Sequence, residues 1–77
     1  MPMAFVLVNT EIGFEDEVIE QIRKVDAAKE VYAVYGLYDI VAKIEGESMA
    51  ELRKVVTDQI RRLDKVRSTL TMIAMTQ

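Results

Sequence analysis

The chain has 77 residues, of which 51% are hydrophobic and 30% are charged, and its formal net charge is −3. A chain this short forms one domain that buries only about 60% of its unfolded surface, so we expect oligomerisation to stabilise it. The absence of cysteine and histidine excludes disulfides, thiolate nucleophiles, imidazole catalysis and zinc sites built from those residues.

Composition and charge also predict the location of the chain in the cell. No apolar stretch reaches the roughly 18 residues that a membrane span needs, and the first residues lack the basic start of a signal peptide. The negative charge repels phosphate backbones, so we expect no direct contact with nucleic acid. We therefore predict a single cytoplasmic domain, residues 1–77, without a DNA-binding domain and without a membrane partner.

The first half of the chain predicts a strand, a helix and a hairpin. Residues 3–10 are apolar at nearly every position, which is typical of a central strand. Phe14, Val18, Ile22 and Val25 then recur at helical spacing, with acidic residues in the first turn and basic residues in the last. Residues 30–35 and 38–45 predict two strands, joined by a two-residue type II′ turn that begins at Gly36.

The second half predicts a helix and a final strand. Ser48, followed three residues later by Glu51, forms a capping box, which predicts that a helix begins here. Residues 66–76 predict the last strand, because apolar and threonine side chains alternate along it. The apolar stripe of the helix consists of Met49, Leu52, Val55, Val56, Ile60 and Leu63.

This order of elements predicts an α+β fold, a ferredoxin-like βαββαβ sandwich. Right-handed crossovers place the first and third strands at the centre of a four-stranded antiparallel sheet, with both helices on one face. The first and last strands carry apolar residues on both faces, and the helices can cover only one. We therefore expect a dimer in which two sheets pack through their other faces.

Few residues in the sequence suggest chemistry. We expect no catalytic residue, no metal site and no cofactor, because the acidic residues at 15–17 are explained by a helix N-terminus. Asp39 is unusual because strands disfavour aspartate, and it is either a turn residue that binds backbone N–H groups or a partner for an ammonium group. Thr69 and Thr71 add two hydroxyl groups to a largely apolar strand, although threonine is also a good strand former.

The segment from Val34 to Val41, the capped helix that follows, and residues 66–72 together resemble the effector domain of the leucine-responsive/asparagine-type (Lrp/AsnC, feast/famine) transcription regulators. The resemblance spans essentially the whole chain. Its most specific parts are Gly36 with Tyr38 and Asp39, and the pair Thr69 and Thr71. In those regulators the domain follows a helix-turn-helix segment, so this chain looks like a stand-alone form.

The resemblance implies how the domain assembles and what it binds. Dimers of such domains form rings, often octamers, and bind free amino acids between dimers. Carried over to this sequence, the ligand-binding residues are Gly36, Tyr38, Asp39, Thr69 and Thr71. Asp39 would hold the α-amino group of the ligand, and the two threonines would reach it from a neighbouring subunit. The position after the glycine is often polar in the family and is Leu37 here, which leaves the ligand unnamed.

We therefore predict a non-enzymatic amino-acid-binding and oligomerisation module that could act on full-length regulators of the same family. Two alternatives stay open at this stage. One is a small dimeric α+β barrel enzyme for an organic substrate, which would need polar or titratable residues on the second face of the sheet, a face that we predict to be apolar. The other is a purely structural assembly domain.

Overall fold

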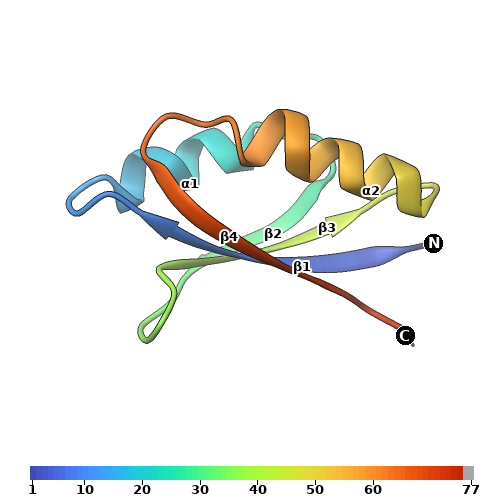
Figure 1. Ribbon diagram of the computed structural model, residues 1–77, viewed down its shortest axis with the longest axis horizontal. Coiled ribbons are helices and arrows are strands. Elements are labelled where there is room, and N and C mark those ends of the chain that lie inside the picture. Colours follow the sequence, from blue (N-terminus) through green and yellow to red (C-terminus); the bar gives the residue numbers. More distant parts are fainter. Residues whose placement is uncertain (76–77) are drawn as a thin grey trace.

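The fold is a single antiparallel sheet with strand order β2-β3-β1-β4, and both helices lie on one side of it (Figure 1). A computed structural model describes residues 1–75. The elements are β1 (Met3–Thr10), α1 (Glu15–Arg23), β2 (Ala28–Ala33), β3 (Ile40–Glu45), α2 (Met49–Val55), a π-helical segment η1 (Val56–Ile60), and β4 (Val66–Ile73). The predicted ferredoxin-like sandwich, with β1 and β3 at the centre of the sheet, is confirmed.

The boundaries of three predicted strands differ from the structure. The last strand ends at Ile73, and its predicted end at residue 76 lies outside the described residues. The strand before Gly36 keeps its predicted length but lies two residues earlier, from Ala28 to Ala33, and the strand after it is shorter, because β3 begins only at Ile40. The connection between them therefore spans residues 34–39 and is not a two-residue turn.

The core lies between the sheet and the helices. Along β1 every second side chain is buried, which is the period expected of a strand with one covered face. The helices contribute Ile22, Leu52 and Ile60, whose side chains are fully buried. On the sheet side, the fully buried hydrophobic residues are Ala4, Val6, Val8, Ile40, Ala42 and Ile44.

The other side of the sheet has no helix over it, and we call it the uncovered face. Paired residues of antiparallel strands point to the same side, so the register assigns Leu7, Val41 and Leu70 to this face as one row across three strands. The expectation that this face is apolar is wrong in part, because Lys43 and Glu45 also lie on it. The assigned residues are Met3, Phe5, Leu7, Asn9, Glu30, Tyr32, Val41, Lys43, Glu45, Ser68, Leu70 and Met72.

The second helix begins at the predicted cap. The backbone N–H of Glu51 donates to Ser48 Oγ at 3.1 Å, and the side chain of Glu51 accepts a hydrogen bond from the N–H of Glu47 at 2.9 Å. The helix then widens into η1, where the N–H of Arg61 donates to the carbonyl of Val56 at 2.8 Å, five residues earlier. Such π-helical turns are rare and are often found near functional sites.

Replacing Ser48 with alanine is expected to lower the free energy of unfolding by about 1 kcal/mol, because the N–H of Glu51 loses its acceptor. Urea denaturation followed by circular dichroism measures the change. Ser48→Gly is the matched control, since glycine at an N-cap costs only a few tenths of a kcal/mol. Equal stability of Ser48→Ala and wild type would show that this cap does not stabilise the helix.

Candidate functional site

Asp39 anchors the connection between β2 and β3 to the end of β1. Its carboxylate Oδ2 accepts hydrogen bonds from the backbone N–H of Thr10 at 2.9 Å and from Thr10 Oγ1 at 3.4 Å. Its own N–H donates to the carbonyl of Val8 at 3.0 Å. The side chain thus takes the place of a backbone acceptor where β3 stops pairing with β1.

One carboxylate oxygen of Asp39 remains available. Within residues 1–75, Asp39 Oδ1 makes no hydrogen bond, and no lysine or arginine forms an ion pair with this carboxylate. Asp39 is half-buried, and no buried polar side-chain atom lacks a partner, so Oδ1 is in contact with solvent. This oxygen is therefore open to a further hydrogen bond while Oδ2 stays bonded to Thr10.

The rest of the connection projects away from the helices (Figure 1). Gly36 has a φ of +149°, a region in which residues with a Cβ are strained, and no atom lies within 4 Å of the Cβ that a side chain would add. Tyr35 and Leu37 on either side of it are almost completely exposed, and Tyr38 is half-buried. The loop therefore presents two large apolar side chains to solvent.

Thr69 and Thr71 lie on the helix-covered face of β4. Their partners on β1 are Val8 and Val6, both fully buried on that face. Thr71 opens onto a groove of about 340 Å³ between β4 and the helical segment, and Thr69 does not line it. The residues that line this groove are Leu52, Arg53, Val56, Thr57, Thr71 and Ile73.

The groove combines apolar walls with a free cation. Arg53 is exposed and forms no ion pair with any carboxylate of residues 1–75. A volume of about 300 Å³ or more, apolar walls and a few polar groups are typical of small-molecule sites. Arg53 and Thr57 were not among the site residues predicted from the sequence. No pattern in the sequence sets these two exposed residues apart, and none indicates the π-helical turn.

The single chain does not gather the predicted site residues into one pocket. Gly36, Tyr38 and Asp39 lie in the connection, and none of them lines the groove that contains Thr71. Val8 connects the two sets through the backbone. It pairs with Thr69 on β4, and its carbonyl accepts the hydrogen bond from the N–H of Asp39.

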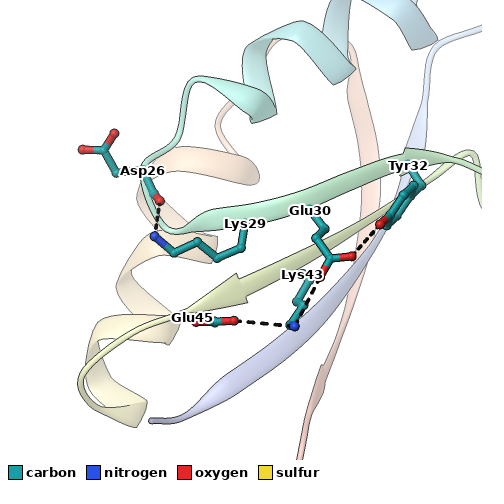
Figure 2. A network of polar contacts seen from close by, with 6 residues as sticks. All are labelled: Asp26, Lys29, Glu30, Tyr32, Lys43 and Glu45. Atoms are coloured by element: carbon teal, nitrogen blue, oxygen red, sulfur yellow. Dashed lines mark hydrogen bonds and ion pairs between the residues drawn. The ribbon is translucent and has the colours of Figure 1, made fainter.

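A second group of polar side chains lies on the uncovered face (Figure 2). Lys43 Nζ is 3.3 Å from Glu30 Oε2 and 3.6 Å from Glu45 Oε2, and we call these three residues the charged strip. The hydroxyl of Tyr32 donates to Glu30 Oε1. Hydrogen bonds from Tyr32 and Lys43 lower the pKa of Glu30, and the carboxylate of Glu30 raises the pKa of both Tyr32 and Lys43.

These pKa shifts favour the ordinary charge states of the three groups, with Glu30 as a carboxylate, Lys43 as an ammonium and Tyr32 as a phenol. Within residues 1–75 no group of acidic side chains is arranged to hold a metal ion. No helix formed by these residues is long and apolar enough to cross a membrane.

Comparison with known proteins gives one consistent result. The family description "Lrp/AsnC ligand binding domain" matches residues 3–77. The HTH-type transcriptional regulator YugG of Bacillus subtilis is 40% identical over 60 residues, which are 78% of this chain and 36% of YugG. The solved structure of FFRP-DM1 is similar with a TM-score of 0.93 and 39% identity, over 97% of this chain and 100% of that chain.

A second curated relative extends the match in sequence. An HTH-type regulator from Pyrococcus furiosus is 35% identical over 74 residues, which are 92% of this chain and 49% of the regulator. The chain therefore spans at most about half the length of these curated relatives, and almost the full length of FFRP-DM1.

Proposed function

This chain belongs to the family of Lrp/AsnC ligand-binding domains, and we propose that it is a non-enzymatic module that binds free amino acids and assembles into oligomers. The observation that carries the proposal is the groove beside Thr71, with apolar walls and the guanidinium of Arg53, which forms no ion pair with a carboxylate of residues 1–75. An amino acid offers a carboxylate for such a cation and an ammonium group for Asp39 Oδ1. Its side chain can lie against the apolar wall.

Assembly is the second part of the proposal. Two copies pack sheet to sheet through the uncovered face, because exposed Leu70 and Met72 extend the apolar row there. The exposed connection at residues 34–39 then reaches the groove of a copy in a neighbouring dimer, so that Gly36, Tyr38 and Asp39 meet Thr69 and Thr71 of another subunit. Dimers joined in this way form a ring, for which we propose an octamer.

The curated relatives are transcriptional regulators, and the proposed role follows from that. The module modulates full-length regulators of the family by joining their assemblies in the cytoplasm when amino acid is bound, without contacting DNA itself. A mixture of the chain with such a regulator, separated by size exclusion with and without amino acid, tests this step. Co-elution that does not depend on amino acid would contradict it.

Amino-acid binding is tested by a thermal-shift screen of the wild-type chain against the twenty standard amino acids. A ligand that binds the folded state raises the melting temperature by mass action. An unchanged melting temperature for every amino acid would contradict sensing and leave a structural assembly domain. Turnover of small organic substrates, in contrast, would support the dimeric barrel enzyme, for which the titratable side chains of the charged strip are the specific observation.

Replacing Arg53 with alanine is expected to weaken binding of the best amino acid from that screen by about tenfold, since an exposed charge-assisted hydrogen bond is lost. Isothermal titration calorimetry measures the affinity. Arg62→Ala removes the same charge from an exposed position that does not line the groove, and it should bind as wild type does. Equal affinities of the two variants would show that Arg53 does not hold the carboxylate.

A further inference from the structure

The outer side of β4 has backbone groups that are free to pair. In the described part of the chain, β4 pairs with β1 alone, so it is an edge strand of the sheet. The N–H of Ala74 donates to the carbonyl of Met3 at 2.9 Å and therefore points toward β1. Because this direction alternates along antiparallel strands, Thr69, Thr71 and Ile73 turn their N–H and carbonyl groups away from β1. We call these three residues the open edge.

The opposite edge of the sheet, β2, is protected. The guanidinium of Arg23 on α1 donates to the carbonyl of Val31 at 3.3 Å, and the pairing with β3 shifts register between Ala28 and Glu30. Charged side chains, bulges and covering segments are ways in which proteins keep edge strands from pairing with other chains. Residues 68–73 of β4 carry no charge and no register shift, so the open edge lacks this protection.

The groove lies on the helix side of the open edge, since Thr71 and Ile73 form part of its lining. A strand added to β4 pairs with the outward groups of the open edge. Residues that pair across two strands point to the same side of the sheet, so the residue opposite Thr71 turns its side chain into the groove with Arg53. Its two neighbours point to the other side, beside exposed Leu70 and Met72.

The lining of the groove determines which side chain fits opposite Thr71. Leu52, Val56 and Ile73 supply apolar walls, and Arg53 supplies a positive charge that no carboxylate of residues 1–75 neutralises. A glutamate matches both features, because its methylene groups pack on the walls and its carboxylate can accept charge-assisted hydrogen bonds from the guanidinium. Valine and threonine suit the neighbouring positions, since both favour strands.

We propose that the open edge binds an extended segment of another protein by strand addition, with main-chain pairing at Thr71 and a glutamate of the segment against Arg53. Main-chain hydrogen bonds hold the segment, and the groove selects the acidic side chain. The inference uses the groove of the proposed amino-acid site, but it does not depend on amino-acid binding.

The test titrates the peptide acetyl-Val-Thr-Val-Glu-Val-Thr-amide into the wild-type chain in a calorimeter. Replacing its glutamate with lysine should weaken binding by at least about tenfold, because two cations then face each other. Arg53→Glu should reverse this preference. Hydrogen exchange followed by NMR should slow at the N–H of Thr71 when the peptide binds, whereas the N–H of Met72, which faces β1, should exchange slowly with and without it.

Thr71→Pro removes an outward N–H and leaves the pairing with β1 in place, since proline is tolerated where the N–H of an edge strand faces solvent. It should weaken peptide binding by at least about tenfold, because a carbonyl of the peptide loses its donor. Ala33→Pro is the matched control. Its N–H faces outward from β2, because neighbouring Val34 donates to Asp39 next to β3, and it should bind the peptide as the wild type does. Circular dichroism confirms that each variant is folded.

Three results would overturn the inference. One is a wild-type chain that binds neither peptide or binds both equally, and another is a Thr71→Pro chain that binds as tightly as the wild type. The third is a lower mass of Thr71→Pro without peptide, since a second copy of the chain would then occupy the open edge. A melting temperature that rises with amino acids in a chain that ignores the peptide contradicts this inference alone, and the reverse contradicts only the proposed function.

Discussion

Replacing Leu7 with glutamate is expected to convert the proposed sheet-to-sheet dimer into a monomer, with a rise in the dissociation constant of at least about a hundredfold. Leu7 lies in the middle of the uncovered face, where its partners across the sheet are Val41 and Leu70. A carboxylate at this place would be buried without a cation when two sheets pack together. Size-exclusion chromatography with light scattering, over a range of protein concentrations, measures the change.

Ile12→Glu is the control for this experiment. Ile12 is also a large apolar residue, but it is 89% exposed in the turn after β1 and does not belong to the uncovered face. We expect this variant to dimerise as the wild type does. If Leu7→Glu kept the wild-type mass at micromolar concentration, the chain would not pair through this face.

Replacing Asp39 with asparagine is expected to weaken amino-acid binding by about 2–5 kcal/mol while leaving the fold intact. The amide oxygen of asparagine can still accept the hydrogen bond from the N–H of Thr10, so the anchor of the connection is kept. The negative charge that would hold the ligand ammonium group is lost. Calorimetry with the best amino acid from the thermal-shift screen measures the binding, and urea denaturation measures the stability.

Asp39→Ala separates the two roles of this carboxylate. It removes both the charge and the acceptor, so the N–H of buried Thr10 loses its partner, and we expect a further loss of about 1–3 kcal/mol in the free energy of unfolding. If Asp39→Asn bound amino acids as tightly as the wild type, Asp39 would not hold the ligand, and its role would be only to fix the connection between β2 and β3 to Thr10.

Much of the fold could be predicted because its signals are local. The capping box at Ser48 and the alternation along residues 3–10 each depend on neighbours in the sequence, and both are found in the structure. The alternation along residues 38–45 also places Lys43 and Glu45 on the second face of the sheet. The prediction of a purely apolar face therefore overlooked charges that the sequence already displayed.

The candidate site could be predicted only in part, because its decisive contacts are distant in sequence. The bond between Asp39 and Thr10 joins residues 29 positions apart, and no local pattern near Gly36 indicates it. The groove requires α2 and β4 to meet, and its shape depends on the π-helical turn at η1. Arg53 therefore looked like one more charge on the solvent side of a helix.

The strand order also determines when the sheet can be completed during synthesis on the ribosome. Of the four strands of this sheet, β1 is made first, yet one of its two neighbours, β4, is made last. Contacts between such distant segments form slowly, and domains fold as they are synthesised. Until Leu70 has emerged, one edge of β1 is open and the row through Leu7 is incomplete. The nascent chain thus cannot pair prematurely through a finished face, because that face is completed by its final strand.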